Sequence, residues 1–138
     1  KLFPETDGAI LSAAVSDFKP KESHHKKVKR GKEDWSVELE PTIDIAGYLG
    51  EHKKKKQLLV GFALETNNEI ENAQKKLKKK NLDFIVLNSL RDEGAGFQHD
   101  TNKITIIDKD NKQQNFELKT KEDVAKDIVS KIIDLLNE

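Results

Sequence analysis

The chain of 138 residues contains neither cysteine nor methionine. Without cysteine it has no disulfide, no thiolate nucleophile and no zinc site built on sulfur. No segment approaches the roughly 20 consecutive apolar residues that a membrane-spanning helix needs, and no secretory signal peptide is recognisable. We therefore expect a cytoplasmic protein with no membrane partner.

An excess of charge of one sign is also missing, because 25 basic residues balance 25 acidic ones. No long-range field attracts nucleic acid or an anionic membrane. Positive charge is local, in the segments Lys19–Arg30, Lys53–Lys56 and Lys75–Lys80. A nucleic-acid-binding module built on these lysines is the weaker alternative, since few aromatic residues accompany them and no known binding motif is present.

The sequence contains no GxGxxG motif, the usual glycine-rich fingerprint for a dinucleotide. Its length suits one domain with a real core. The opening residues, "KLFPETDGA", lack an initiator methionine and resemble the middle of a protein. We expect residues 1–138 to form a single domain that is an N-terminally truncated fragment.

Short apolar runs predict the strands of a sheet. Three of them, Ala9–Val15, Leu58–Phe62 and Asp83–Leu87, have the composition of buried strands. Trp35–Leu39 alternates apolar and polar residues, which is typical of a half-buried strand. Lys103–Ile107 and Asn115–Leu118 flank a polar turn and predict a hairpin.

Capping residues predict where three helices begin. A helix over about residues 43–55 follows Thr42, and another begins at Asn68 with Glu71 as its capping-box partner. Thr120 and Asp123 form a second capping box before a helix over about residues 121–136. The order of strands and helices predicts an α/β fold with a mixed, mainly parallel sheet covered by helices.

Polar and basic residues follow the first predicted strand. Asp17 stands at its carboxyl end, where α/β proteins bind ligands, and the segment that follows, to Lys32, is rich in lysine. A carboxylate beside a cationic loop suits a phosphate ligand with a metal ion. A solvated surface loop is the other interpretation of the same residues.

Five motifs together point to a family. "AAVSDF", "KKVKR", "GFALET", "KNLDFIVLN" and "GAGFQHDTNKITII" occur in this order and cover almost the whole chain. In these motifs the chain closely resembles the bacterial phosphopantothenoylcysteine synthetase domain of coenzyme A biosynthesis. The resemblance implies a three-layer, Rossmann-like α/β fold, a basic flap over about residues 17–32, a C-terminal β-hairpin and a homodimer.

The resemblance also implies a reaction. The enzyme is a ligase that joins 4′-phosphopantothenate to cysteine through an acyl-cytidylate, using CTP with Mg²⁺. FMN is expected only if a decarboxylase domain is fused to it. Family members carry a further N-terminal Rossmann-like portion with a glycine-rich loop and an asparagine that assists the intermediate, and neither is present here. A non-catalytic nucleotide-binding or dimerisation fragment is therefore the alternative.

Lys27 is the candidate catalytic residue. It opens "KVKR", which matches the Lys-x-Lys-Lys flap motif of the family, with Arg30 in place of the last lysine. A lysine on a closing flap neutralises charge that develops on the α-phosphate and the acyl oxygen. Without the resemblance, a solvated lysine in a basic loop is the simpler interpretation.

The resemblance implies nucleotide contacts at twelve positions: Ala13, Ala14, Val15, Asp17, Lys27, Ile43, Asp44, Ile45, Ala46, Phe62, Lys76 and Lys80. Asp17 is also the candidate metal ligand. Alternatives remain for several of them: a loop cap for Asp17, an acid serving the helix dipole for Asp44, and ordinary core for Phe62. The neighbouring Lys75, Lys78 and Lys79 are expected to form a solvated helix face.

Overall fold

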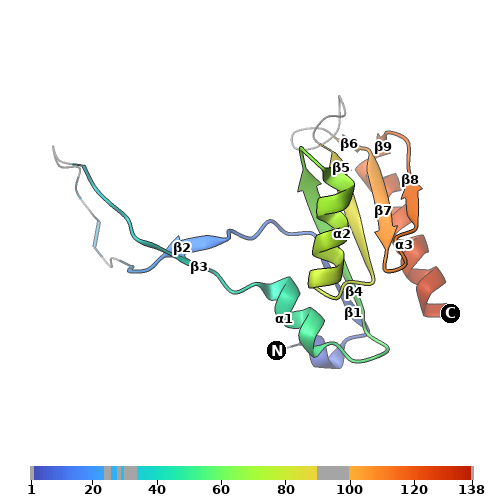
Figure 1. Cartoon of the computed structure of the whole chain (residues 1–138), viewed down its shortest axis with the longest axis horizontal. Coiled ribbons are helices and arrows are strands. Elements are labelled where there is room, and N and C mark those ends of the chain that lie inside the picture. The colour runs from blue at the N-terminus through green and yellow to red at the C-terminus, as the bar shows by residue number, and fades with distance from the viewer. Residues whose placement is uncertain (1, 24–25, 28, 30–33, 90–99, 138) are drawn as a thin grey trace.

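The computed structural model describes residues 2–23, 26–27, 29, 34–89 and 100–137. Its centre is a five-stranded sheet (Figure 1). In spatial order the strands are β1 (Gly8–Leu11), β4 (Leu58–Glu65), β5 (Phe84–Ser89), β7 (Ile104–Asp108) and β8 (Gln113–Asn115). Strands β1, β4 and β5 pair in parallel, and β7 is antiparallel to both of its neighbours. Four of the five strands thus run in one direction, which confirms the mixed, mainly parallel sheet.

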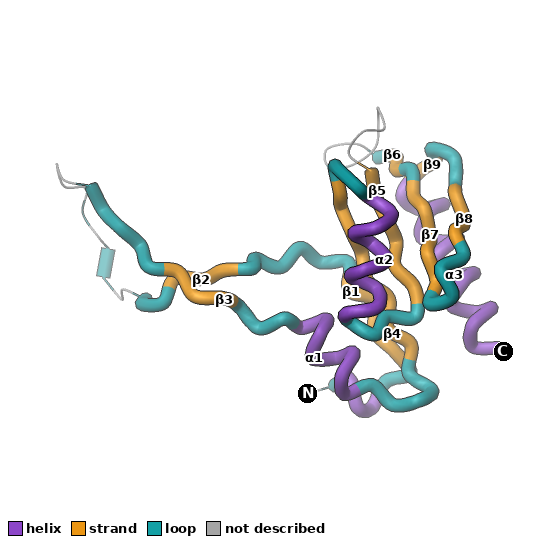
Figure 2. The backbone as a smooth tube through the Cα atoms, viewed as in Figure 1, coloured by secondary structure: helices purple, strands orange, loops and turns teal. Residues whose placement is uncertain are grey.

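Helices cover both faces of this sheet. On one face α1 (Ile45–His52) and α2 (Glu69–Lys79) pack over alternate residues of the central strands, among them Leu59, Ile85 and Ile107. On the other face α3 (Lys121–Asn137) packs over the intervening residues, among them Val60, Phe84 and Ile106. Because side chains alternate along a strand, each central strand contributes to two cores. The predicted three-layer arrangement is confirmed (Figure 2).

Two smaller elements, a 3₁₀ helix and a two-stranded ladder, lie outside the five-stranded sheet. A 3₁₀ helix, η1 (Phe3–Glu5), is tied to the loop before β4 by Gln57, whose Nε2 donates to the carbonyl oxygens of Phe3 and Thr6 at 2.6 and 2.7 Å. β6 (Thr101–Asn102) pairs with β9 (Lys119–Thr120) beside the start of α3. Among the described residues, no helix combines the length and apolarity needed to cross a bilayer.

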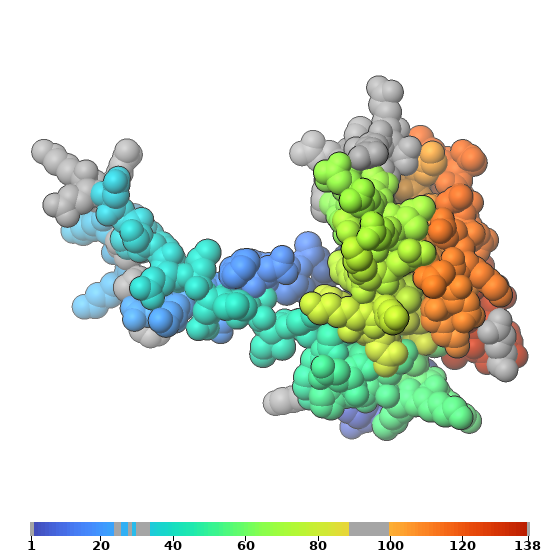
Figure 3. Space-filling model, in the orientation of Figure 1, coloured from blue at the N-terminus to red at the C-terminus, as the bar shows by residue number. Residues whose placement is uncertain are grey.

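A long extension leaves the body between β1 and α1 (Figure 3). We call its described residues between positions 16 and 42 the arm. β2 (Phe18–Pro20) and β3 (Leu39–Pro41) form a short antiparallel ladder at its base. An ion pair of 3.0 Å between Lys19 Nζ and Glu40 Oε1 crosses this ladder. The segment predicted as one uninterrupted loop therefore contains a strand.

Two predicted strands are wrong in extent. The strand predicted over Ala9–Val15 ends at Leu11, because β4 pairs only with Gly8–Leu11. Val15 is exposed, beyond the last pair of the ladder. The strand predicted over Trp35–Leu39 does not form; only Leu39 enters β3. The side chain of Trp35 is 64% exposed, because the arm has no core on which an alternating strand can bury one face.

The predicted N-terminus of the first helix is also wrong. Asp44, not Thr42, caps α1, and its Oδ1 accepts the amide of Gly47 at 3.0 Å. Thr42 instead closes the base of the arm, because its hydroxyl donates to the carbonyl oxygen of Ser16 at 2.6 Å. The helix ends at His52, since Lys53 has an extended backbone.

The other predicted caps differ from each other. α2 begins after Asn68 as expected, but Asn68 has a φ of 45° and its side chain makes no capping hydrogen bond, so the predicted box with Glu71 is absent. The cap of α3 is confirmed, because Thr120 Oγ1 accepts the amide of Asp123 at 3.2 Å. The hairpin is confirmed as β7–β8, although its second strand is Gln113–Asn115 instead of Asn115–Leu118.

Asp83 joins three parts of the fold, and its replacement should be costly. Its Oδ2 accepts both the Nζ of Lys53 and the amide of Leu59 at 2.7 Å, with the Lys53 and Asp83 side chains only 12% and 18% exposed. Asp83→Ala leaves two donors without their acceptor and should lower the free energy of unfolding by about 2–4 kcal/mol. Denaturant unfolding measures this. Glu71→Ala, which removes an exposed pair with Lys75, is the control and should change little; equal effects would contradict the assignment.

Candidate functional site

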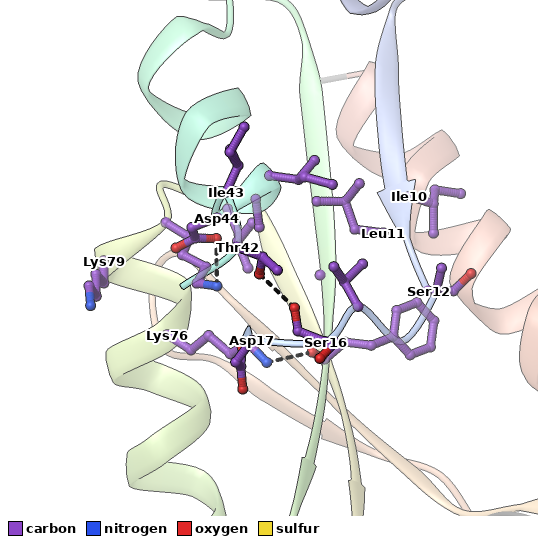
Figure 4. A pocket seen from close by; sticks show the side chains of 18 residues that line it. Ile10, Leu11, Ser12, Ser16, Asp17, Thr42, Ile43, Asp44, Lys76 and Lys79 are labelled. Carbon is purple, nitrogen blue, oxygen red and sulfur yellow. Dashed lines mark hydrogen bonds and ion pairs between the residues drawn. The ribbon is translucent and has the colours of Figure 1, made fainter. Parts of the chain in front are cut away.

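A cavity of about 600 Å³ opens where β1 ends (Figure 4). Its walls come from the segment that follows β1, the N-terminus of α1, the middle of β4 and the lysine-bearing end of α2. The short pairing of β1 creates this space, because the chain leaves the sheet after Leu11 while β4 continues to Glu65. Its volume lies within the range of small-molecule sites, about 300–1,000 Å³.

The N-terminus of α1 forms the most polar wall. Asp44 caps the helix, and its Oδ1 also lies 2.9 Å from the Nζ of Lys80. The hydrogen bond from the Gly47 amide and that from Lys80 hold the pKa of the Asp44 carboxyl below its usual value. The amides of Ile45 and Ala46 lie in the first turn, where a helix has no acceptor of its own for them. This end of α1 therefore favours an anion.

Lysines at the C-terminal end of α2 form the adjoining wall. Lys76, Lys79 and Lys80 all line the cavity. The Nζ of Lys76 donates to the carbonyl oxygen of Phe62 at 3.0 Å, which holds its ammonium beside β4. Lys75 lies outside the cavity and pairs with Glu71 at 2.6 Å. The basic surface of α2 is thus divided into a part that faces the cavity and a part that faces solvent.

The segment after β1 supplies the third wall. Asp17 lines the cavity, and its carbonyl oxygen accepts the amide of Thr42 at 2.9 Å, so its backbone is fixed to the start of α1. Among the described residues no group of three or more metal-ligating side chains is assembled. One carboxylate is nevertheless enough for Mg²⁺ that arrives on phosphates, because such an ion keeps substrate oxygens and waters as its other ligands.

Ten of the twelve residues predicted to contact a nucleotide line this cavity: Ala13, Val15, Asp17, Ile43, Asp44, Ile45, Ala46, Phe62, Lys76 and Lys80. The structure brings them together from four separate segments. As ligand contacts they stay predictions. Phe62 also packs against the core below α3, so both of its proposed roles agree with its position.

Two predicted residues lie elsewhere, and others were missed. Ala14 is not part of the cavity wall, and Lys27 is exposed on the arm. Arg30 lies outside the described residues. Lys79 is exposed, as expected, although it also belongs to the cavity wall. Thr42 and Ser16 line the cavity as well and were not predicted. No sequence pattern assigns these three residues to the site, because their place in the wall depends on how separate segments come together in the fold.

Comparison with known proteins identifies the family of the chain. Residues 1–136 match the family described as DNA/pantothenate metabolism flavoprotein C-terminal domain. The chain belongs to this family. A solved structure of the C-terminal domain of the coenzyme A biosynthesis bifunctional protein CoaBC is 38% identical, with a TM-score of 0.78 over 99% of this chain and 58% of that one.

Two curated relatives extend the comparison. Cysteine/cysteine sulfinic acid decarboxylase from an unknown prokaryotic organism is 62% identical over 99% of this chain and 38% of its own length. The CoaBC protein of Bacillus subtilis strain 168 is 44% identical over 95% of this chain and 32% of its own length. The chain therefore spans about a third of these relatives.

The lowered pKa of Asp44 predicts a pH dependence of stability. A carboxyl whose pKa falls on folding stabilises the protein at pH values above its unfolded pKa, here 3.8. This stabilisation is lost as the pH falls through the lowered pKa of the folded state. Asp44→Asn, which keeps a capping side chain, should thus be less stable than the wild type near neutral pH. The gap should close below pH 3.8, as thermal unfolding across pH will measure. Glu51→Gln, on the exposed side of the same helix, is the control for an acid-to-amide change. A gap between Asp44→Asn and the wild type that does not vary with pH would contradict a lowered pKa for Asp44.

Proposed function

We propose that this domain binds CTP as its magnesium complex in the cavity at the end of β1. Within a longer protein it would join 4′-phosphopantothenate to cysteine. The observation that carries the proposal is the convergence of the α1 N-terminus, the α2 lysines and Asp17 on one cavity in a member of this family. The relative named as a coenzyme A biosynthesis protein supports it.

The walls of the cavity suit the two parts of a nucleoside triphosphate. The first-turn amides of α1 and the ammonium groups of Lys76 and Lys80 favour the phosphates. The small and apolar side chains Ala13 and Val15, together with Phe62, favour the base and ribose. Asp17 would hold Mg²⁺ through one carboxylate, and the ion would offset phosphate charge.

The proposed reaction has two steps. A carboxylate oxygen of 4′-phosphopantothenate attacks the α-phosphorus of CTP, and the bond to pyrophosphate breaks. The cysteine amine then attacks the acyl carbon of the resulting acyl-cytidylate, so an amide forms, CMP leaves and the amine loses a proton. We assign to Lys27 the neutralisation of charge that develops on the phosphate and acyl oxygens. The arm would have to bring Lys27 to a cavity, since it is exposed and absent from the wall.

A homodimer is the proposed assembly. Phe18, Val37 and Leu39 are 55%, 45% and 58% exposed on the arm. A two-stranded ladder is marginally stable alone in water, so a second copy that covers these side chains would stabilise it. The proposed location is the cytoplasm. FMN is proposed only for a fused decarboxylase domain.

Because the chain spans about a third of its curated relatives, a nucleotide-binding fragment without catalysis is the second candidate. The two candidates share the cavity and differ in turnover. Calorimetric titration with CTP and with ATP, each with Mg²⁺, tests the binding that both require. The release of pyrophosphate on addition of 4′-phosphopantothenate and cysteine then distinguishes the ligase, which turns over, from a fragment that only binds the nucleotide.

Lys76→Ala should weaken the binding of magnesium–CTP by about 10- to 100-fold, since a charged hydrogen bond to phosphate is lost. Calorimetry measures the Kd. Lys75→Ala is a matched control on the same helix, because Lys75 lies outside the cavity and pairs with Glu71. Equal losses for both variants would place the phosphates elsewhere.

Lys27→Ala should keep CTP affinity within a few-fold but slow turnover by about 10²- to 10³-fold, because charge in the transition state is no longer neutralised. The measurement is the rate of amide formation in the longer enzyme. Lys26→Ala, which changes an adjacent exposed lysine, should turn over normally. An unchanged rate in Lys27→Ala would remove the residue from the mechanism.

A further inference from the structure

Gly50 makes an unusually close contact outside the cavity wall. It is buried in the last turn of α1. A Cβ at this position would lie 1.9 Å from the carbonyl oxygen of Lys80 and 2.8 Å from its carbonyl carbon. Both atoms belong to the backbone and cannot turn aside as a side chain does. The last turn of α1 therefore rests directly on the chain where α2 ends.

Asn81 completes this contact. Its backbone has a φ of 48°, a conformation that asparagine accepts more readily than most residues. Its Nδ2 donates to the carbonyl oxygen of Gly50 at 2.8 Å. That carbonyl belongs to the last turn, where a helix provides no donor of its own. Gly50 and Asn81 thus form one docking point, with close packing and a hydrogen bond at the same place.

Lys80 connects the docking point to the cavity. Its carbonyl oxygen faces Gly50, and its Nζ reaches Asp44 Oδ1 at 2.9 Å at the other end of the same helix. Two points of contact, about 9 Å apart along the helix axis, set the direction of α1 relative to α2. One of these points, the cap Asp44, lines the cavity, whereas Gly50 does not.

We propose that Gly50, docked by Asn81, is a positioning residue that holds the anion-binding N-terminus of α1 against Lys80. The consequence for nucleotide affinity rests on the function proposed above. A methyl group at residue 50 tilts α1 away from the end of α2, so Asp44 and Lys80 separate without any change in the cavity residues themselves. Intrinsic helix propensity would by itself stabilise α1 in this variant, because alanine is a better helix former than glycine. A loss of docking therefore cannot come from helix propensity.

The first test does not need a ligand. In Gly50→Ala the pKa of Asp44, followed by the ¹³C shift of its carboxyl group, should rise toward its ordinary value, because Lys80 no longer donates to it. Lys80→Gln should produce the same rise directly, and adding Gly50→Ala to Lys80→Gln should raise it no further. Glu51→Ala, an exposed neighbour in the same turn, is the matched control and should leave the Asp44 pKa unchanged.

The second test measures affinity. Gly50→Ala should weaken magnesium–CTP binding about tenfold, and in the Lys80→Gln background it should add little, because both changes act on the same contact. Full additivity would overturn the proposal, and so would an unchanged Asp44 pKa in a folded Gly50→Ala protein. If the wild type binds no CTP while the Asp44 pKa still responds, the proposed function fails and the positioning role stands.

A milder variant covers the case in which Gly50→Ala does not fold. Asn81→Gly allows the same positive φ but removes the amide that holds Gly50. It should shift the Asp44 pKa in the same direction by a smaller amount. A folded Asn81→Gly protein with the wild-type Asp44 pKa would contradict the proposal.

Discussion

Burial of β4 and β5 on both faces is the constraint on which the rest of the structure depends. Phe84, Ile85 and Val86 are fully buried although they are consecutive and point alternately to opposite faces. Each face therefore needs its own cover, α1 and α2 on one side and α3 on the other. Because β4 is held in place and continues to Glu65, while β1 ends at Leu11, a space is left beside the second half of β4. The cavity is a consequence of strands of unequal length in a sheet that is covered on both sides.

The sheet and its helices could largely be predicted from the sequence, because their apolar patterns are strong. The strands around Leu59 and Ile85 and the whole of α3 follow from hydrophobic runs that bury a core. The failures lie where tertiary context decides. Val15 extends an apolar run, but β4 offers no partner there, and Trp35 alternates correctly without any core to face.

The residues of the candidate site likewise divide into those that the sequence indicated and those that only the folded structure reveals. Lys76 and Lys80 were expected in the site only because the resemblance implies them, since Lys75 and Lys79 have the same spacing of four residues. Lys79, which is exposed, also belongs to the wall, and no motif in the sequence marked it. Thr42 precedes α1 and is a residue type that commonly caps helices, yet its hydroxyl donates to the carbonyl oxygen of Ser16. The capping hydrogen bond is made by Asp44 instead. The sequence indicated that a capping residue precedes α1, but not which of the neighbouring Thr42 and Asp44 makes the capping hydrogen bond.

The position of the arm has a thermodynamic consequence. The arm lies in the connection between β1 and β4, whose pairing joins Gly8 to Leu58 across the chain. The entropic cost of closing such a connection grows only with the logarithm of its length, by about 0.6 kcal/mol for each doubling. The hydrogen bond between Thr42 and Ser16 already closes the base of the arm, and β2 and β3 pair only with each other and not with the five-stranded sheet. The reach of the arm can therefore lengthen or shorten at little cost in folding free energy, while the cavity beside its base stays as it is.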